Sequence, residues 1–148
     1  MVKLEYVGEN KTPTVVSDKV SIEDIPVITE HIEEILGNND VPMKVIFQIN
    51  IAIDEMYSNI AKFAYESGKE GSASVSIDIK PDVQTLYVSF TDEGEPYNPL
   101  EQADPDTTLS AEERDIGGLG IFMVKKSMDD MLYKYEDGKN ILTLVKKI

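Results

Sequence analysis

Residues 51–65 read IAIDEMYSNIAKFAY, and their apolar side chains recur at helical spacing. With the residues before them they predict a helix from about Pro42 to Tyr65, ended by Ser67-Gly68. Its buried face is predicted to consist of Val45, Ile49, Ala52, Met56, Ile60 and Phe63. Glu55 and Asn59 are four residues apart, so they lie on one stripe of this helix, at the edge of its apolar face.

The pair Glu55 and Asn59 has the side chains that phosphate chemistry needs. The amide oxygen of Asn59 is a suitable neutral ligand for Mg²⁺ beside phosphates. Glu55, one turn earlier, can accept a proton from a water or a serine hydroxyl that attacks a phosphate. The alternative is a solvated Glu–Asn pair, which many helices carry by chance and which the spacing alone favours.

A hairpin and an acidic turn follow this helix. Residues 75–79 and 86–90 alternate apolar and polar side chains, and Lys80-Pro81-Asp82 between them is typical of a turn. Asp92, at the end of the second strand, can accept a hydrogen bond from an exocyclic amine such as that of adenine. Gly94 lets the backbone approach a flat ring closely. The more common alternative is an ordinary Asp/Gly turn that closes a strand.

A glycine-rich stretch, Gly117-Gly118-Leu119-Gly120, leads into a short predicted helix over 120–128. Its glycines leave backbone N–H groups free to surround phosphates at a positive helix end, and Arg114 can add a positive charge near a γ-phosphate. The alternative is a flexible turn, because a lone glycine-rich stretch is weak evidence. It lacks the Lys-Ser/Thr ending of a Walker A loop and the βαβ context of a dinucleotide fingerprint.

The remaining pattern completes an α+β fold. Residues 3–7 resemble an edge strand, and residues 25–35 form an amphipathic helix stopped at Gly37. A final hairpin joins 131–135 to 141–146 through Asp137-Gly138. This order predicts one domain over 1–148: a two-layer sandwich with helices on one face of a mostly antiparallel mixed sheet. Residues 95–117 break the pattern, and such a long segment is typical of an active-site lid.

Composition excludes several classes of function. The chain of 148 residues has no cysteine and a single histidine, His31, so disulfides, zinc fingers and multi-histidine metal sites are excluded. Its formal net charge of −14 disfavours direct binding to nucleic acid or anionic membranes. The N-terminus has no signal-peptide pattern and no apolar run suits a membrane helix, so we expect a cytoplasmic protein.

The three motifs in this order resemble the GHKL (Bergerat, histidine-kinase-like) ATPases, from about Ser21 to the C-terminus. The wording FTDEGEPYNPL…IGGLGIFMVKKSMDDMLYKYEDGKN is most similar to the bacterial anti-sigma-factor serine-protein kinases. The resemblance implies that Asn59 holds Mg²⁺ between ATP phosphates and that Glu55 is the general base. It also implies that Asp92 binds the adenine amine above Gly94. Gly117, Gly118, Leu119 and Gly120 would line the triphosphate, with Arg114 near the γ-phosphate.

The same resemblance implies protein partners: a sigma factor, a STAS-domain antagonist that is phosphorylated on serine, and commonly a second copy of the chain. Two departures stand out, because Pro96 replaces a second glycine found in many GHKL proteins and Phe63 replaces a histidine. The first hypothesis is an ATP-dependent serine kinase in a partner-switching module. The alternative is an ATP-binding anti-sigma or regulatory module without catalysis, and phosphotransfer distinguishes the two.

Overall fold

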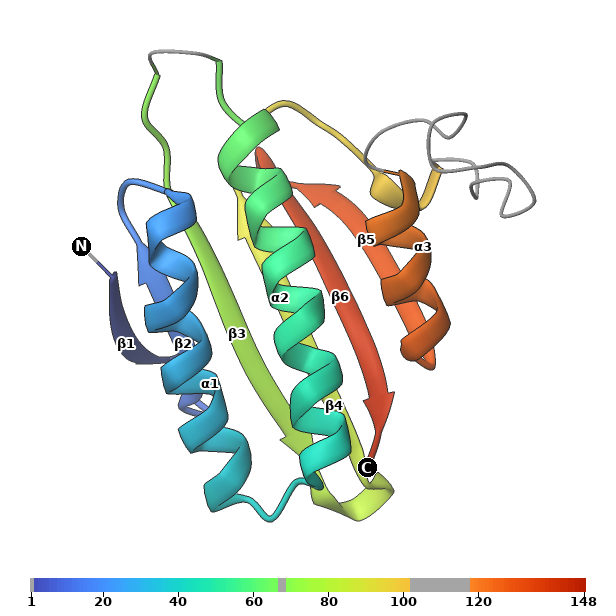
Figure 1. The fold of residues 1–148 in the computed structure, drawn as a ribbon. Helices are drawn as coiled ribbons and strands as arrows, with labels where there is room; N and C mark the ends of the chain where they lie inside the picture. Colours follow the sequence, from blue (N-terminus) through green and yellow to red (C-terminus); the bar gives the residue numbers. More distant parts are fainter. Residues whose placement is uncertain (1, 67–68, 102–117) are drawn as a thin grey trace.

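The computed structural model describes residues 2–66, 69–101 and 118–148, and these residues build one sheet covered by helices. In the described chain six strands lie in the order β1-β2-β3-β4-β6-β5, and every neighbouring pair is antiparallel (Figure 1). The strands are β1 (Val2–Val7), β2 (Thr12–Ser17), β3 (Ala73–Lys80), β4 (Thr85–Asp92), β5 (Asp130–Glu136) and β6 (Lys139–Lys147). The predicted α+β class is confirmed.

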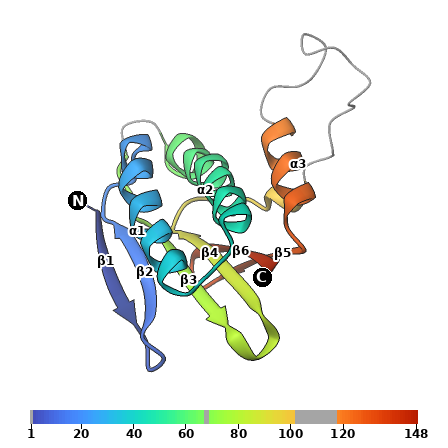
Figure 2. The same ribbon diagram turned by 60° about the horizontal axis from the view of Figure 1, so that its bottom comes forward.

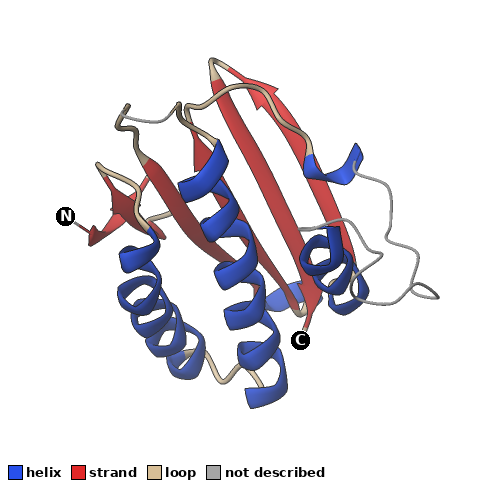
Figure 3. Ribbon diagram, turned by 45° about the horizontal axis from the view of Figure 1, so that its top comes forward, coloured by secondary structure: helices blue, strands red, loops and turns tan. Residues whose placement is uncertain are grey.

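The helices α1 (Ile25–Asn38), α2 (Met43–Phe63) and α3 (Gly118–Ser127) all pack on the same face of the sheet. Figures 2 and 3 show the two layers, with α2 between α1 and α3. The buried face of α2 consists of Val45, Ile46, Ile49, Ala52, Ile53, Met56 and Tyr57. These side chains meet buried residues of the central strands such as Val88, Phe90 and Leu144. Each such burial contributes roughly 1.5–3 kcal/mol, so the sandwich depends on this interface.

A capping box precedes α1 and marks where that helix begins. Ser21 caps the short 3₁₀ turn Ile22–Asp24 before α1, because its hydroxyl accepts the N–H of Glu23 while the Asp24 carboxylate accepts the N–H of Ser21. Asp24 also accepts a 2.7 Å hydrogen bond from the Tyr57 hydroxyl, which ties this capping box to α2. Both predicted helices are confirmed: α2 agrees to within two residues, and α1 continues through Gly37, its predicted stop, to Asn38.

The two predicted hairpins are also confirmed. β3 and β4 pair from Ala73–Asp92 to Lys80–Thr85 around a 3₁₀ turn at Pro81–Val83. β5 and β6 are joined by Asp137-Gly138, whose φ values of 54° and 77° give the two left-handed positions of a type I′ turn.

One strand was missed by the sequence prediction. β2 (Thr12–Ser17) lies between β1 and β3. Residues 3–7 therefore belong to the edge strand, as predicted, but this strand pairs with β2 and does not reach β3. The segment includes Pro13, which lacks an N–H group and argues against a central strand. The proline is tolerated because β2 pairs with β3 only over Thr14–Ser17, which leaves Pro13 paired with β1 alone.

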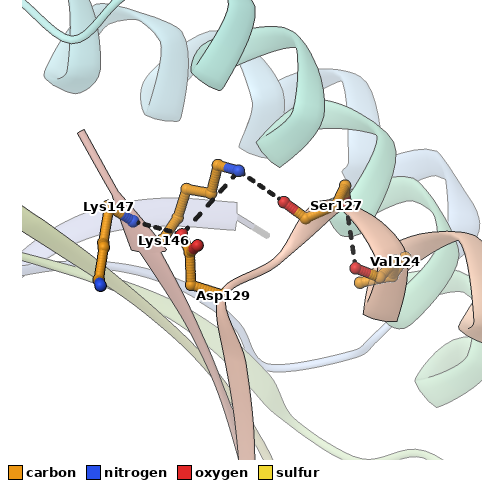
Figure 4. A network of polar contacts seen from close by, with 5 residues as sticks. All are labelled: Val124, Ser127, Asp129, Lys146 and Lys147. Carbon is orange, nitrogen blue, oxygen red and sulfur yellow. Dashed lines mark hydrogen bonds and ion pairs between the residues drawn. The ribbon is translucent and has the colours of Figure 1, made fainter.

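A polar network fixes the C-terminal end of α3 to β6 (Figure 4). Lys146 Nζ donates to the Ser127 carbonyl oxygen at 2.7 Å, where the helix ends, and lies 4.0 Å from Asp129 Oδ2. Asp129 Oδ2 accepts the N–H of Lys147 at 2.7 Å. A cation at a helix C-terminus also interacts favourably with the helix dipole. The network therefore holds α3 in a fixed position on the sheet.

No helix in the described residues is long and apolar enough to cross a membrane.

Candidate functional site

A pocket of about 600 Å³ lies at the C-terminal end of α2, where α2, the end of β4, β6 and α3 meet. This volume falls within the range of roughly 300–1,000 Å³ that ligand sites occupy. Its apolar walls come from four elements and include Met56, Ile60, Phe90, Ile121 and Leu142. Its polar side chains include Glu55, Ser58, Asn59, Lys62, Asp92, Glu95 and Asn140. Apolar walls with a few polar groups are typical of a small-molecule site.

Glu55 and Asn59 both line this pocket from α2 and are partly buried. They are therefore not a fully solvated pair. Gly120, in the first turn of α3, packs directly against the Glu55 carboxylate, and a Cβ at this glycine would overlap the carboxylate. The absence of a side chain at Gly120 thus leaves the space that Glu55 occupies.

Asp92 lies in the same pocket, at the end of β4, with a relative exposure of 7%. Its Oδ1 accepts the N–H of Gly94 at 2.8 Å and the side-chain amide of Asn140 at 3.0 Å. Within the described residues Oδ2 forms no hydrogen bond, so this oxygen is available to a ligand. Burial raises the pKa of Asp92 above its ordinary value, against the two hydrogen bonds, which lower it. A buried carboxylate held in this way is costly unless a ligand uses it.

Gly94 makes a close backbone contact that was not predicted from the sequence. A Cβ at Gly94 would overlap the Ala64 carbonyl oxygen just after α2, which also accepts the N–H of Glu95 at 3.3 Å. Gly94 therefore brings the turn after β4 against the end of α2. Its predicted place beneath an adenine ring stays a prediction.

The glycine-rich motif is described only in part. Gly118, Leu119 and Gly120 form the first turn of α3, and Gly120 reaches the pocket through its contact with Glu55. Arg114 and Gly117 lie outside the described residues, as do residues 102–117 of the predicted lid.

Several lining residues were not identified from the sequence. Lys62 is the one cation among the described lining residues and lies seven positions after Glu55, on the same helix stripe. Tyr97 also lines the pocket and is 53% exposed. Phe63 lines it too, but it is 73% exposed, so its predicted place on the buried face of the helix was wrong. The spacing from Glu55 could have indicated Lys62, whereas Tyr97 and Asn140 are brought in by the loop and the sheet register.

The described residues contain no group of three or more His, Asp or Glu side chains that could hold a metal by themselves. Asn59 therefore suits a metal that takes most of its ligands from bound phosphate and water, as Mg²⁺ usually does. Asn59 lies near Glu55 and Lys62 on the same helix, so its amide oxygen could contact such a metal while the lysine attracts the phosphates.

Comparison with known proteins shows which family has this fold and sequence. A family model described as a histidine kinase-like ATPase domain matches residues 19–146. The chain belongs to this family. The histidine kinase domain of a blue-light activated histidine kinase from Erythrobacter litoralis has the same fold, with a TM-score of 0.55 at 13% identity over 84% of this chain and 59% of that chain.

Two curated relatives of this histidine kinase-like ATPase domain are named as protein kinases. The serine/threonine-protein kinase BtrW of Bordetella bronchiseptica is 26% identical over 66% of this chain and 68% of its own length. The serine-protein kinase RsbW of Listeria monocytogenes is 30% identical over 66% of this chain and 63% of its own length. The resemblance drawn from the three motifs is therefore confirmed at the level of the family.

Proposed function

We propose that this chain binds Mg-ATP in the pocket and transfers the γ-phosphoryl group to a serine of a partner protein. The observation that carries the proposal is that one pocket is lined by Glu55 and Asn59 from α2 and by Asp92 from β4. Glu55 supplies a proton acceptor and Asn59 a metal ligand, while Asp92 supplies a hydrogen-bond acceptor for an exocyclic amine. The names of the two kinase relatives support the same activity.

In the proposed complex the adenine lies toward Asp92. Oδ2 of Asp92 accepts a hydrogen bond from the exocyclic amine, while Oδ1 stays bonded to Gly94 and Asn140. The ring lies among apolar side chains such as Phe90 and Leu142, where the removal of water strengthens that hydrogen bond. The triphosphate extends toward Asn59 and Lys62, near the first turn of α3.

The proposed transfer step uses Glu55 as general base. The oxygen of the acceptor serine forms a bond to the γ-phosphorus, and the bond from that phosphorus to the β,γ-bridging oxygen breaks, so that ADP leaves. The proton of the serine hydroxyl passes to the Glu55 carboxylate. Gly120 leaves room for this carboxylate at the pocket wall. Mg²⁺, bound by Asn59 and the phosphates, would neutralise charge on the phosphate oxygens.

The resemblance to anti-sigma-factor kinases extends the proposal to the partners. We infer a sigma factor and a STAS-domain antagonist as protein partners, the latter carrying the acceptor serine, with a homodimer as the assembly and the cytoplasm as the compartment. The net charge of −14 favours partners with basic surfaces over nucleic acid.

Asn59→Ala is expected to lower phosphoryl transfer by roughly 10²-fold or more and to weaken Mg-ATP binding, because the amide oxygen that orients the metal is lost. The chain is incubated with Mg-ATP labelled in the γ-phosphoryl group and with a STAS-domain protein, and the label transferred to serine is measured. Nucleotide affinity is measured in parallel by calorimetry.

Asn50→Ala is the matched control, because Asn50 lies on the same helix and its amide donates to Glu33 at 2.7 Å, away from the pocket. This variant should transfer phosphate at the normal rate. Wild-type protein that binds Mg-ATP but never labels the substrate would support the non-catalytic ATP-binding module instead.

Gly120→Ala is expected to lower phosphoryl transfer at least tenfold while changing the free energy of unfolding by less than about 1 kcal/mol. The new methyl group overlaps the Glu55 carboxylate, and the flexible Glu55 side chain can move away at little cost to the fold. Chemical denaturation and the same phosphotransfer assay measure the two quantities. Gly37→Ala is the control, since its added Cβ meets no atom within 4 Å. Normal transfer by Gly120→Ala would contradict the assigned position of Glu55.

A further inference from the structure

Asn140 on β6 lies directly opposite Asp92 on β4 in the register of the sheet. Both side chains are buried, with relative exposures of 6% and 7%, and both line the pocket. A buried amide in a strand otherwise made of apolar residues, threonine and lysine needs hydrogen-bond partners on all sides. Asn140 has them.

The amide nitrogen of Asn140 contacts three acceptors on one side. Nδ2 donates to Asp92 Oδ1 at 3.0 Å and to the Glu95 carbonyl oxygen at 2.9 Å, and a longer contact of 3.4 Å reaches the Gly94 carbonyl oxygen. One NH₂ group therefore joins the carboxylate of Asp92 to the backbone that follows it.

The amide oxygen of Asn140 accepts from two donors on the other side. Tyr97 donates its backbone N–H to Oδ1 at 3.0 Å, and the Tyr133 hydroxyl of β5 donates to the same oxygen at 2.5 Å. These donors determine which end of the amide faces Asp92, because a reversed amide would place an oxygen against a carboxylate.

Asparagine is the side chain of this length that satisfies both sides. Aspartate has no hydrogen to donate when ionised and would repel Asp92, and leucine has neither donor nor acceptor. With Oδ1 of Asp92 held by Asn140 and Gly94, the carboxylate cannot rotate without losing two hydrogen bonds. Only Oδ2 then remains for a ligand.

We propose that Asn140 is the positioning residue for base recognition: its amide orients Asp92 so that a single acceptor faces the exocyclic amine of the nucleotide. The proposal rests on the ATP site proposed above and adds a residue to it. Discrimination between bases then depends on Asn140 as well as on Asp92, although Asn140 itself need not touch the base.

The test compares the affinities of ATP and inosine triphosphate, which carries a carbonyl oxygen in place of the exocyclic amine. Wild-type protein should prefer ATP by roughly tenfold or more, as expected for a hydrogen bond to a charged group. Asn140→Leu should bind ATP at least tenfold more weakly and lose most of this preference. Tyr133→Phe removes only the hydroxyl that orients the amide, and should reduce the preference in the same direction but less.

Thr143→Val is the matched control on β6, because Thr143 bonds to Ser89 on the other face of the sheet. It should keep the full preference for ATP. If Asn140 had a merely structural role, Asn140→Leu would lower the affinities for ATP and inosine triphosphate equally. An unchanged preference for ATP in Asn140→Leu and Tyr133→Phe would overturn this inference but leave the proposed ATP site standing. Wild-type protein that binds neither nucleotide would refute the proposed function and this inference with it.

Discussion

Replacing Glu55 by glutamine is expected to lower phosphoryl transfer to a serine substrate by roughly 10²- to 10⁴-fold, the usual contribution of a general base. Glutamine has the same size and fits beside Gly120, but its amide cannot take the proton of the attacking hydroxyl. Mg-ATP affinity should change little, because Asn59, Lys62 and Asp92 remain in place. Single-turnover phosphotransfer and calorimetric titration with Mg-ATP measure the two effects separately.

The matched control is Asp54→Asn, which removes the same charge from the neighbouring position of α2. Asp54 is exposed and does not line the pocket, so this variant should transfer phosphate normally. If both variants lose activity equally, the net charge of α2 and not a proton acceptor is responsible. Full activity of Glu55→Gln would show that no side-chain base acts at this position.

Much of the fold could be predicted because its signals are local. The apolar spacing of α2, the Asp137-Gly138 turn and the alternation of β3 and β4 each depend on a few neighbouring residues. β2 could not be predicted in the same way. Its Pro13 is acceptable only because the pairing with β3 begins one residue later, and that register is a tertiary property.

In the candidate site, too, residues related by local geometry could be predicted, whereas residues brought together by tertiary structure could not. Glu55 and Asn59 are related by helix geometry alone, and their joint presence in the pocket follows from one turn of α2. Asn140 reaches Asp92 only through the register of β4 and β6, at a separation of 48 residues. Gly94 was identified for its predicted proximity to a ring, whereas its close approach to the Ala64 carbonyl oxygen was not predicted. Such close approaches of backbone depend on how α2 and the sheet meet.

Asp92→Asn is expected to abolish the preference for ATP without harming the fold. The new amide oxygen can take the place of Oδ1 and keep both hydrogen bonds, from the Gly94 N–H and from Asn140. Its NH₂ group then replaces Oδ2 and faces the ligand, where it repels the exocyclic amine of adenine. ATP affinity should fall by roughly tenfold to a hundredfold. Inosine triphosphate, with an acceptor at that place, should now bind better than ATP.

The stability of the ligand-free variant separates this effect from unfolding. Burial raises the pKa of Asp92 above the ordinary 3.8, so its protonated form stabilises the fold at low pH and that contribution is lost as pH rises through the raised pKa. At pH 7 the buried, ionised carboxylate therefore lowers the free energy of unfolding, and Asp92→Asn should unfold at the same temperature as wild type or higher.

A saturating ligand at about 100 times its dissociation constant adds about 2.7 kcal/mol to the free energy of unfolding, which a thermal scan detects easily. Wild type should gain this shift with Mg-ATP, and Asp92→Asn should gain it with the inosine nucleotide instead. A variant that keeps the ATP shift would show that the carboxylate does not bind the base, and a lower melting temperature without ligand would show that Asp92 is held in place for stability.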